Sequence, residues 1–281
     1  MTSMNVPGWF NSMPSYIGPM DAAGLKIVGG YYDNPKNGLP YIRANVVVLD
    51  PRNGDLKAVI GGDWISLART GSQPAIACKY LAVKTDAVCI IGSGLQARAS
   101  LKCMAAKLDI KEVRVCDLRP EARKAFIKDF EGYPFRMIDC ETNREGCEGA
   151  DVIITLTTAN APLVKNEWVK KGALVLTMGS YTEIAEELSL GVDKRYTDHM
   201  GQCLHRGNFK ELVDAGKISE KDFVGILSDV MTGKIPGREN PEERIIMAII
   251  GMGAPDLTIG ALALKRIEEQ GIDVAEIDIM G

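Results

Sequence analysis

The chain has 281 residues, 46% of them hydrophobic, a formal net charge of −4 and a sequence pI near 5.4, and this length favours two domains over one large domain. Its basic residues are dispersed along the sequence, so we expect no nucleic-acid partner. No apolar run reaches the roughly 18–20 residues that cross a bilayer and no signal sequence is recognisable, so we expect a cytoplasmic protein without a membrane partner.

The first 83 residues predict a small antiparallel sheet. Three stretches are strand-like, at residues 24–28, 41–49 and 56–60. Between the last two, residues 51–54 (Pro-Arg-Asn-Gly) have the composition of a tight turn. The last two strands are therefore expected to form a hairpin.

From about residue 84, short apolar runs alternate with helical segments. This alternation predicts a Rossmann-type, doubly wound parallel sheet with helices on both faces. The runs are nearly continuous in Val, Ile and Leu, as expected of strands buried on both sides. The predicted strands are residues 88–91, 113–116, 135–138, 152–156, 174–178 and 195–198.

The C-terminal segment, residues 241–270, has a helical pattern. Asn240 is placed to cap this helix and Pro241 to occupy its first turn, while Gly251, Gly253 and Pro255 are expected to bend or split it. We therefore expect a Rossmann domain at residues 84–236, inserted into a smaller α+β domain. That smaller domain combines residues 1–83 with residues 237–281.

A glycine motif follows the first predicted Rossmann strand. Gly92-x-Gly94-x-x-Ala97 comes directly after residues 88–91. Gly92 permits a tight turn, Gly94 lets the backbone approach a pyrophosphate, and Ala97 allows close helix packing. The free amides and positive dipole end of the following helix then face the phosphates. The motif predicts a dinucleotide site, with a strand–helix turn that binds no cofactor as the alternative.

The acidic residue after the second Rossmann strand indicates the nucleotide. Asp117 follows Gly92 by 25 residues, where its carboxylate can accept hydrogen bonds from an adenosine ribose. Arg119 could instead accommodate a 2′-phosphate, but Asp117 would repel it, so we favour NAD over NADP. The expected contacts to this part of the cofactor are Gly92, Ser93, Gly94, Leu95, Gln96, Ala97, Asp117, Leu118 and Arg119.

Several segments resemble, in order, the landmarks of the ornithine cyclodeaminase and mu-crystallin family. They include Ile91-Gly-Ser-Gly-Leu-Gln-Ala-Arg98 and Gly233-Lys-Ile-Pro-Gly-Arg238, and the resemblance runs from about residue 12 to the C-terminus. It implies the fold predicted above, with the smaller domain binding substrate and forming a homodimer. Members are NAD(P)-dependent cyclodeaminases, amino-acid dehydrogenases and ketimine reductases, which move a hydride at the α-carbon of an amino acid or its imine. The other segments that carry the resemblance are residues 24–28, 34–40, 67–70 and 149–153.

The resemblance also implies roles for individual residues. Lys26 would lie beside the carboxylate and α-nitrogen of the substrate, and Arg69 would bind the carboxylate through its planar fork. The alternatives are a solvent-exposed lysine at a strand end and a salt bridge at a helix start. Thr70 would contact a cofactor phosphate. Thr157 and Thr158 would face the nicotinamide, with capping of the strand end as the alternative.

Tyr181 departs from the pattern of the cyclodeaminases. Met178, Gly179 and Ser180 are expected beside the nicotinamide, and cyclodeaminases usually carry an aspartate acid/base at the next position. A phenol with a pKa of about 10 is protonated at neutral pH, so it donates a proton but is a poor base. We therefore assign Tyr181 as a candidate catalytic residue that assists protonation of the nitrogen, with loop packing as the alternative.

A second departure concerns the ends of the chain. The family normally has several tens of residues ahead of the stretch at residues 13–17, including an arginine that helps to hold the carboxylate. We expect either a truncated start, or a reduced dimer domain in which carboxylate binding relies on Lys26 and Arg69. Asp256 keeps an acidic position of the family, either as a capping or packing carboxylate or as a functional one.

The leading hypothesis is an NAD-dependent oxidoreductase that acts on an α-amino acid or its cyclic imine, in amino-acid metabolism. One alternative is ornithine cyclodeaminase, which converts ornithine to proline and ammonia. The other is a non-catalytic NAD(P)H-binding protein or accessory subunit. The side chain of the substrate is left open.

No metal site or disulfide framework is expected. The seven cysteines are widely spaced and include no Cys-x-x-Cys pair, and we expect Cys89 and Cys116 to be core residues. His199 and His205 do not have the spacing of metal ligands, so structural or surface roles are expected. The acidic run at residues 183–187 is interpreted as a solvated helix face.

Overall fold

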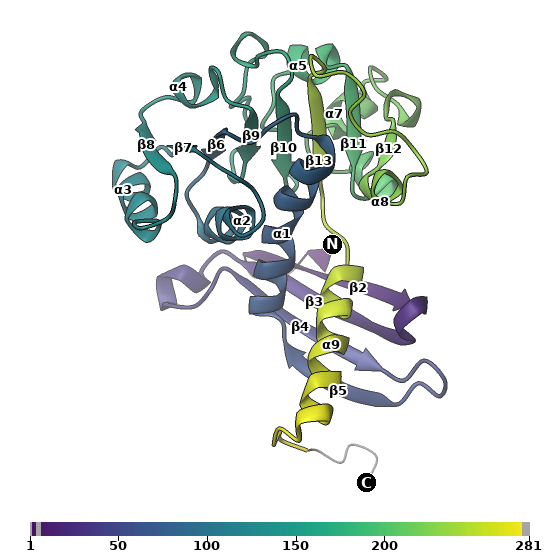
Figure 1. The fold of residues 1–281 in the computed structure, drawn as a ribbon. Helices are drawn as coiled ribbons and strands as arrows, with labels where there is room; N and C mark the ends of the chain where they lie inside the picture. Colours follow the sequence, from purple (N-terminus) through teal and green to yellow (C-terminus); the bar gives the residue numbers. More distant parts are fainter. Residues whose placement is uncertain (1, 4–6, 277–281) are drawn as a thin grey trace. The chain divides into compact units, whose positions relative to one another are not determined.

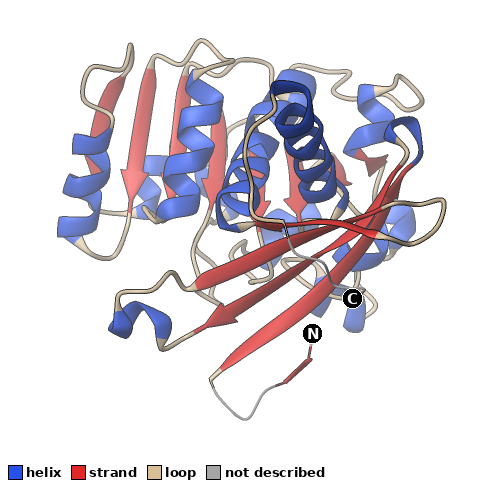
Figure 2. Ribbon diagram, turned by 90° about the horizontal axis from the view of Figure 1, so that it is seen from below, coloured by secondary structure: helices blue, strands red, loops and turns tan. Residues whose placement is uncertain are grey.

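We describe the protein from a computed structural model, which covers residues 2–3 and 7–276 (Figures 1 and 2). The chain forms two compact units, Met1–Arg69 with Met252–Gly281, and Thr70–Gly251. The divisions therefore fall at Arg69 and Gly251, whereas the sequence placed them near residues 84 and 237. Residues 1 and 4–6 of the N-terminal stretch lie outside the described residues.

The first unit is built on a five-stranded antiparallel sheet in the order β1-β2-β3-β4-β5. The three strands predicted from sequence correspond to β3, β4 and β5. Strand β2 was not predicted, because Pro14 and several polar residues interrupt its apolar pattern. The elements are β1 (Thr2–Ser3), β2 (Gly8–Ile17), η1 (Gly18–Met20), β3 (Ala22–Tyr31), η2 (Asn34–Asn37), β4 (Ile42–Leu49) and β5 (Leu56–Gly61).

Helix α9 (Ala254–Gln270) covers one face of this sheet, lying on β2, β3 and β4 (Figure 1). The small core of the unit contains Val46, Val48 and Leu257, and Ile65 from the start of helix α1 (Asp63–Leu81). A Cβ at Gly260 would lie 2.9 Å from Val46 Cγ1, so a larger residue there would force either this side chain or the helix to shift.

The second unit contains an eight-stranded, entirely parallel sheet in the order β12-β11-β13-β10-β9-β6-β7-β8. The Rossmann-type prediction is confirmed, and all six predicted strands are present. The strands are β6 (Ala87–Ile91), β7 (Glu112–Cys116), β8 (Arg136–Cys140), β9 (Val152–Thr155), β10 (Leu174–Met178), β11 (Lys194–Thr197), β12 (Gly225–Ile226) and β13 (Ile245–Ile249).

Both faces of the parallel sheet are covered (Figure 2). Successive residues of a strand point to opposite faces, so Val88 and Ile90 belong to one core, and Cys89 and Ile91 to the other. The second half of α1 contributes to the first of these cores. The covering elements are α2 (Leu95–Ala105), α3 (Pro120–Asp129), α4 (Asn143–Cys147), η3 (Asn166–Trp168), α5 (Glu186–Gly191), α6 (Met200–Cys203), α7 (Lys210–Asp214), η4 (Glu220–Asp222) and α8 (Leu227–Met231).

The prediction of a helix across residues 241–270, bent or split at Gly251, Gly253 and Pro255, was wrong for its first part and is confirmed for the part after the split. Residues 245–249 form β13, which lies between β10 and β11, and helix α9 begins only at Ala254. In a short run of Ile, Met and Ala that is buried on both sides, the spacing of hydrophobic residues does not distinguish a strand from a helix. Gly251 and Gly253 separate the two elements, and Pro255 lies in the first turn of α9.

Among the described residues, no helix is long and apolar enough to cross a membrane. Within the same residues, no three His, Cys, Asp or Glu side chains are grouped so that they could hold a metal ion. Cys89 and Cys116 are buried, as predicted. His199 is exposed and caps α6, with Nδ1 accepting a hydrogen bond of 3.3 Å from the Gln202 amide.

Replacing Leu257 with Ala is expected to destabilise the first unit by about 2–5 kcal/mol, because the side chain is fully buried against the sheet. The same substitution at Leu262 on the same helix, where the side chain is 46% exposed, is the matched control and should cost under about 1 kcal/mol. Urea unfolding followed by circular dichroism measures both. Equal midpoints for the two variants would contradict this packing.

Candidate functional site

Three charged side chains meet in the interior of the first unit. Lys26 Nζ lies 2.9 Å from Asp256 Oδ2, and Arg69 Nε lies 3.0 Å from the same oxygen. They come from β3, the first turn of α9, and α1. Lys26 pairs in register with Met13 and Val46, on the sheet face that α9 covers. With its side chain 1% exposed, Lys26 is not the solvent-facing lysine of the alternative interpretation.

The charges in this cluster do not cancel. Two cations face one carboxylate, so one positive charge remains while Lys26 is protonated. Burial, together with the positive charge of Arg69, lowers the pKa of Lys26 to about 8, although Asp256 opposes the shift. Asp256 Oδ1 is buried and accepts no hydrogen bond from the residues that the structure describes. A buried positive charge of this kind favours an anionic partner.

Asp256 is therefore the counterion of Lys26 and Arg69. It lies in the first turn of α9, where the helix dipole also favours a negative charge. Removing this carboxylate would leave two buried cations facing each other, which is a severe electrostatic cost.

In the second unit, the glycine loop has the geometry of a phosphate-binding turn. Gly92 has a φ of +99°, and a Cβ there would lie 2.7 Å from the Leu156 carbonyl oxygen, so only glycine fits. Gly94 caps the N-terminus of α2, and a Cβ built on it meets no described atom within 4 Å. The loop backbone is thus open beside the helix terminus, which fits a pyrophosphate.

Asp117 lies at the carboxyl end of β7, next to this loop. Its Oδ2 accepts hydrogen bonds from the Ser93 amide (3.0 Å) and hydroxyl (2.7 Å), and its Oδ1 accepts one from the Arg119 amide (3.0 Å). Burial opposes ionisation, but these hydrogen bonds outweigh it and hold the pKa of Asp117 below its ordinary value. The neighbouring Leu118 is apolar and 99% exposed, a surface that suits an adenine ring. The residues present therefore fit a dinucleotide.

The loops that follow β9 and β10 are linked by hydrogen bonds. Glu183 Oε1 accepts from the Thr157 amide (3.0 Å) and hydroxyl (2.6 Å), and Asn160 Oδ1 accepts from the Thr182 amide (3.0 Å). The prediction that residues 183–187 form a solvated helix face was wrong for Glu183, which is 1% exposed; helix α5 begins only at Glu186. Burial raises the pKa of Glu183, and its bonds to Thr157 oppose the shift.

The loop after β10 also bonds to the segment after β11. Ser180 Oγ accepts hydrogen bonds from Arg206 Nε (3.1 Å) and Nη2 (2.8 Å). Tyr181, the next residue, is partly buried. Sequence reasoning missed Arg206, because it belongs to no motif and comes from a loop whose position depends on the sheet order.

The remaining predicted site residues lie on α1, at the start of α2 and at or after the ends of β9 and β10. Thr70 is on α1 and is the first residue of the second unit. Thr158 is exposed after β9, Met178 is buried at the end of β10, and Gly179 has a φ of +119°. Leu95, Gln96 and Ala97 form the first turn of α2, with Ala97 fully buried.

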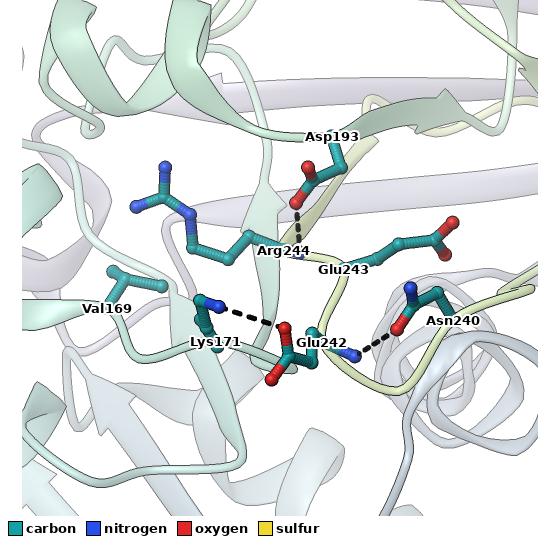
Figure 3. A pocket seen from close by; sticks show the side chains of 7 residues that line it. All are labelled: Val169, Lys171, Asp193, Asn240, Glu242, Glu243 and Arg244. Carbon is teal, nitrogen blue, oxygen red and sulfur yellow. Dashed lines mark hydrogen bonds and ion pairs between the residues drawn. The ribbon is translucent and has the colours of Figure 1, made fainter.

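A surface depression of about 400 Å³ lies at the opposite, amino-terminal edge of the parallel sheet (Figure 3). Its charged groups already have partners: Lys171 Nζ lies 2.9 Å from Glu242, and the Arg244 amide donates to Asp193 (2.7 Å). Cofactors of such sheets bind at the carboxyl ends of the strands, so this is not the nucleotide site. It is lined by Val169, Lys171, Asp193, Asn240, Glu242, Glu243 and Arg244.

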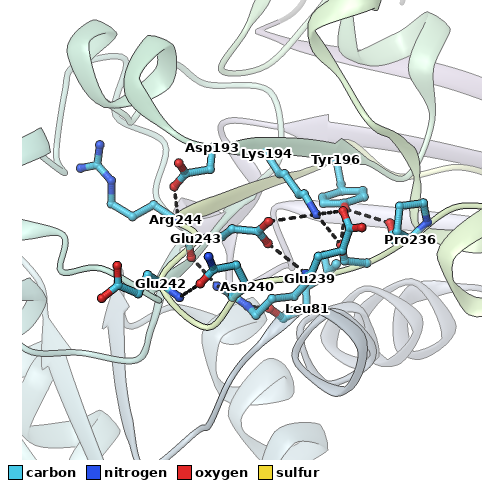
Figure 4. Close-up of polar contacts among 12 residues, drawn as sticks. Leu81, Asp193, Lys194, Tyr196, Pro236, Glu239, Asn240, Glu242, Glu243 and Arg244 are labelled. Atoms are coloured by element: carbon cyan, nitrogen blue, oxygen red, sulfur yellow. Dashed lines mark hydrogen bonds and ion pairs between the residues drawn. The ribbon is translucent and has the colours of Figure 1, made fainter.

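Next to this depression, ion pairs attach residues 236–244 to the sheet (Figure 4). Lys194 Nζ contacts Glu239 (2.6 Å) and Glu243 (3.1 Å), and the Tyr196 hydroxyl donates to the Pro236 and Gly237 carbonyls at 3.0 and 2.9 Å. Arg238, part of a family landmark, donates to the Leu81 carbonyl at 2.7 Å. These contacts indicate a structural role for this segment.

Known proteins are similar to this chain over both of its units. The model of the ornithine cyclodeaminase/mu-crystallin family matches residues 1–271. Iminosuccinate reductase of Paracoccus denitrificans is 31% identical over 97% of this chain and 86% of its own.

Two solved structures are similar over the same length. Δ1-pyrroline-2-carboxylate reductase of Thermococcus litoralis, in complex with NADH and L-proline, has a TM-score of 0.89 and 29% identity, over 96% of this chain and 85% of its own. An archaeal alanine dehydrogenase dimer with bound NAD has a TM-score of 0.92 and 28% identity, over 99% of this chain and 87% of its own. The chain therefore belongs to the ornithine cyclodeaminase/mu-crystallin family.

Proposed function

We propose that the protein is an NAD-dependent oxidoreductase that moves a hydride at the α-carbon of an amino acid or its imine. The observation that carries the proposal is the buried cluster of Lys26, Arg69 and Asp256, whose two cations and one carboxylate sum to a net charge of +1 while Lys26 is protonated. The substrates named for the relatives, iminosuccinate, pyrroline-2-carboxylate and alanine, all carry a carboxylate on the reacting carbon. Such a carboxylate would neutralise that charge.

In this proposal the second unit holds the cofactor. The glycine loop from Gly92 to Ala97 and the N-terminus of α2 bind the pyrophosphate, and Asp117 accepts from the adenosine ribose. Leu118 and Arg119 border the adenosine, and Thr70 contacts a phosphate. The residues assigned to the nicotinamide end are Thr157, Thr158, Met178, Gly179 and Ser180. Bound NAD supplies hydride transfer, and the protein supplies its orientation.

Lys26 and Arg69 hold the substrate carboxylate in this proposal. The guanidinium of Arg69 offers a planar pair of donors, and the ammonium of Lys26 adds a point charge. Asp256 holds both cations in place, because it takes both through one oxygen. Carboxylate binding by Lys26 and Arg69 orients the α-carbon, and this orientation is expected to supply much of the rate enhancement of hydride transfer.

Tyr181 is proposed to donate a proton to the substrate nitrogen in the direction of imine reduction. A phenol is a poor base at neutral pH, which disfavours the cyclodeaminase mechanism that relies on an aspartate. The proposal is supported by the position of Tyr181, directly after Ser180 in the loop that follows β10.

The proposed function is tested by incubating the purified protein with NADH and a panel of cyclic imines, or of 2-oxo acids with ammonia. Oxidation of NADH at 340 nm is the expected result. Incubation of ornithine with catalytic NAD, followed by assays for proline and ammonia, separates a cyclodeaminase from a dehydrogenase. Tight NADH binding without turnover of any of these compounds would refute an oxidoreductase and support the non-catalytic alternative.

Replacing Asp117 with Ser is expected to weaken NADH binding at least about tenfold and to shift the preference towards NADPH. The substitution removes the ribose acceptor and the negative charge that repels a 2′-phosphate, and Arg119 remains beside it. Fluorescence titration with both cofactors measures the change. Arg119→Ala is the control and should keep the preference for NADH; an unchanged preference in Asp117→Ser would rule out this assignment.

Carboxylate binding is expected to weaken as the pH rises through about 8, where Lys26 loses its charge. The effect on stability has the opposite sign. Because the pKa is lowered on folding, the unfolded chain binds more protons between about pH 8 and 10.5, and stability rises with pH there. Calorimetric titration with pyruvate from about pH 6.5 to 9.5 tests the binding. Lys26→Met should bind weakly at every pH, and an equally steep pH dependence in this variant would exclude Lys26 as its source.

We further propose that the protein forms a homodimer through the sheet face of the first unit that α9 does not cover. Pro14, Leu25, Val47 and Val59 are register partners across four adjacent strands and form an apolar row on that face. Val59 is 61% exposed, which is unusual for a valine within a strand. The archaeal alanine dehydrogenase with the same fold is a dimer.

Val59→Lys is expected to weaken this dimer at least about tenfold, because a charge would enter an apolar interface. Light scattering after size-exclusion chromatography measures the mass across a concentration series. Val83→Lys, at a valine of the second unit that is 49% exposed, is the control and should leave the dimer intact. A dimeric Val59→Lys variant would place the interface elsewhere.

A cytoplasmic location, and the expectation that neither nucleic acid nor membrane is a partner, stay predictions from the sequence. The expectation about nucleic acid rests on the modest negative charge and the dispersed basic residues. Fractionation of cells that express the tagged protein would test the location.

A further inference from the structure

Glu183 is a buried carboxylate whose hydrogen bonds come from uncharged donors. It is 1% exposed, and its Oε1 accepts from the Thr157 amide (3.0 Å) and the Thr157 hydroxyl (2.6 Å). Within the part of the chain that the structure describes, no lysine, arginine or histidine forms an ion pair with it. Because burying a carboxylate without a counter-charge costs free energy, packing alone does not account for Glu183.

The backbone around Glu183 is held by contacts within the second unit. The Glu183 carbonyl accepts a hydrogen bond of 2.7 Å from the Leu163 amide, and Val164 and Ile184 form a parallel bridge beside it. The Ile184 amide donates to Asn208 Oδ1 at 2.9 Å, and Asn208 is 1% exposed. The carboxylate is therefore fixed by the protein itself, which is the condition for orienting a neighbouring group towards a ligand.

The Thr157 hydroxyl is oriented by two hydrogen bonds. It donates to Glu183 Oε1, which also accepts from the backbone amide of Thr157 and so acts as an acceptor. The hydroxyl oxygen in turn accepts a hydrogen bond of 3.0 Å from the Ala159 amide. A hydroxyl has one proton and two lone pairs, so one lone pair is left. In this orientation Thr157 accepts a hydrogen bond from a ligand but has no proton to donate to it.

Thr157 lies beside the glycine turn of the same unit. It follows β9, which pairs with β6, and a Cβ at Gly92 would lie 3.0 Å from Thr157 Cγ2. Asp117, to which the adenosine ribose is assigned, follows β7 on the other side of β6. A dinucleotide on such a sheet crosses this point, with its two halves on opposite sides. Thr157 is therefore on the side where the nicotinamide is expected.

We propose that Glu183 is a positioning residue, which orients the Thr157 hydroxyl as an acceptor for the carboxamide N–H of the nicotinamide. The proposal rests on the function proposed above and specifies how its cofactor site recognises the nicotinamide. The carboxamide carries two N–H donors, whereas the acetyl group of a 3-acetylpyridine dinucleotide has a similar shape and none. The site therefore selects the amide, because the acetyl group leaves the remaining lone pair of Thr157 without a donor.

The test compares NADH with its reduced 3-acetylpyridine analogue, in which a methyl group replaces the amide NH2. Both dissociation constants are measured by calorimetry on the full-length protein. Wild-type protein is expected to bind NADH at least about tenfold more tightly than the analogue. General damage to the fold weakens both ligands alike, so the ratio of the two constants reports the hydrogen bond specifically.

Three variants assign the ratio to these two side chains. Thr157→Val keeps the methyl group that faces Gly92 but loses the hydroxyl, and it is expected to reduce the ratio to under about threefold. Glu183→Leu is expected to have the same effect, because the freed hydroxyl turns its proton towards the acetyl oxygen. Glu183→Gln keeps an acceptor oxygen and should therefore keep most of the ratio.

Two controls isolate the effect. Thr232→Val removes an exposed hydroxyl that donates to the Ser228 carbonyl at 2.9 Å, and it should leave the ratio unchanged. ADP-ribose has the adenosine and the pyrophosphate but no nicotinamide. Thr157→Val and Glu183→Leu should bind it as tightly as wild-type protein does, because the proposal gives neither residue a role at that end of the cofactor.

The proposal is overturned if wild-type protein binds both dinucleotides equally, or if either Thr157→Val or Glu183→Leu keeps the wild-type ratio. The outcomes separate it from the proposed function. Turnover of an imine with NADH by a wild-type protein that does not distinguish the two dinucleotides would keep the function and reject the role of Glu183. A ratio that depends on Thr157 and Glu183, without turnover of any imine, would keep the nicotinamide site and reject the oxidoreductase.

Discussion

The structure of the first unit depends on one buried ionic contact, in which Lys26 and Arg69 share a single oxygen of Asp256. Charges that leave water lose several kcal/mol of hydration each, and they are tolerated only when opposite charges and donors meet at short range. The three residues come from a strand, the helix that leads into the second unit and the C-terminal helix. Because Asp256 is the anion of this cluster, residues 252–281 have to return to the N-terminal sheet.

This buried cluster is not the most stable way to fill the interior of the first unit. A neutral, apolar core at the same place would be no less stable, since buried ion pairs often contribute little net free energy. The cluster instead leaves one positive charge and a lysine whose pKa is lowered to about 8. Ionisable groups with perturbed pKa values concentrate at functional sites, which is why the cluster supports the proposed binding of a substrate carboxylate.

The second unit follows a different constraint. Its strands are parallel, so all of their carboxyl ends lie at one edge, and the loops there can bond to each other. Thr157 to Glu183, Thr182 to Asn160, and Arg206 to Ser180 are contacts of this edge. Each loop is therefore positioned by its neighbours, and Ser180, the residue before Tyr181, is bonded to Arg206.

The amino-acid sequence alone determined the local features: the parallel strands, the antiparallel sheet, the Gly92–Gly94 turn and the acid at position 117. Each depends on residues close together in the chain, through apolar runs, φ angles or strand ends. Only the tertiary structure decided that residues 245–249 are a strand, that Glu183 is buried, and that Asp256 and Arg206 face the groups they do. Those outcomes depend on which distant segments pack together. The same apolar run, acidic run or single arginine occurs in many different structural environments. Neighbours in space, which the local pattern does not contain, supply the burial and the counter-charges that give these side chains their chemistry.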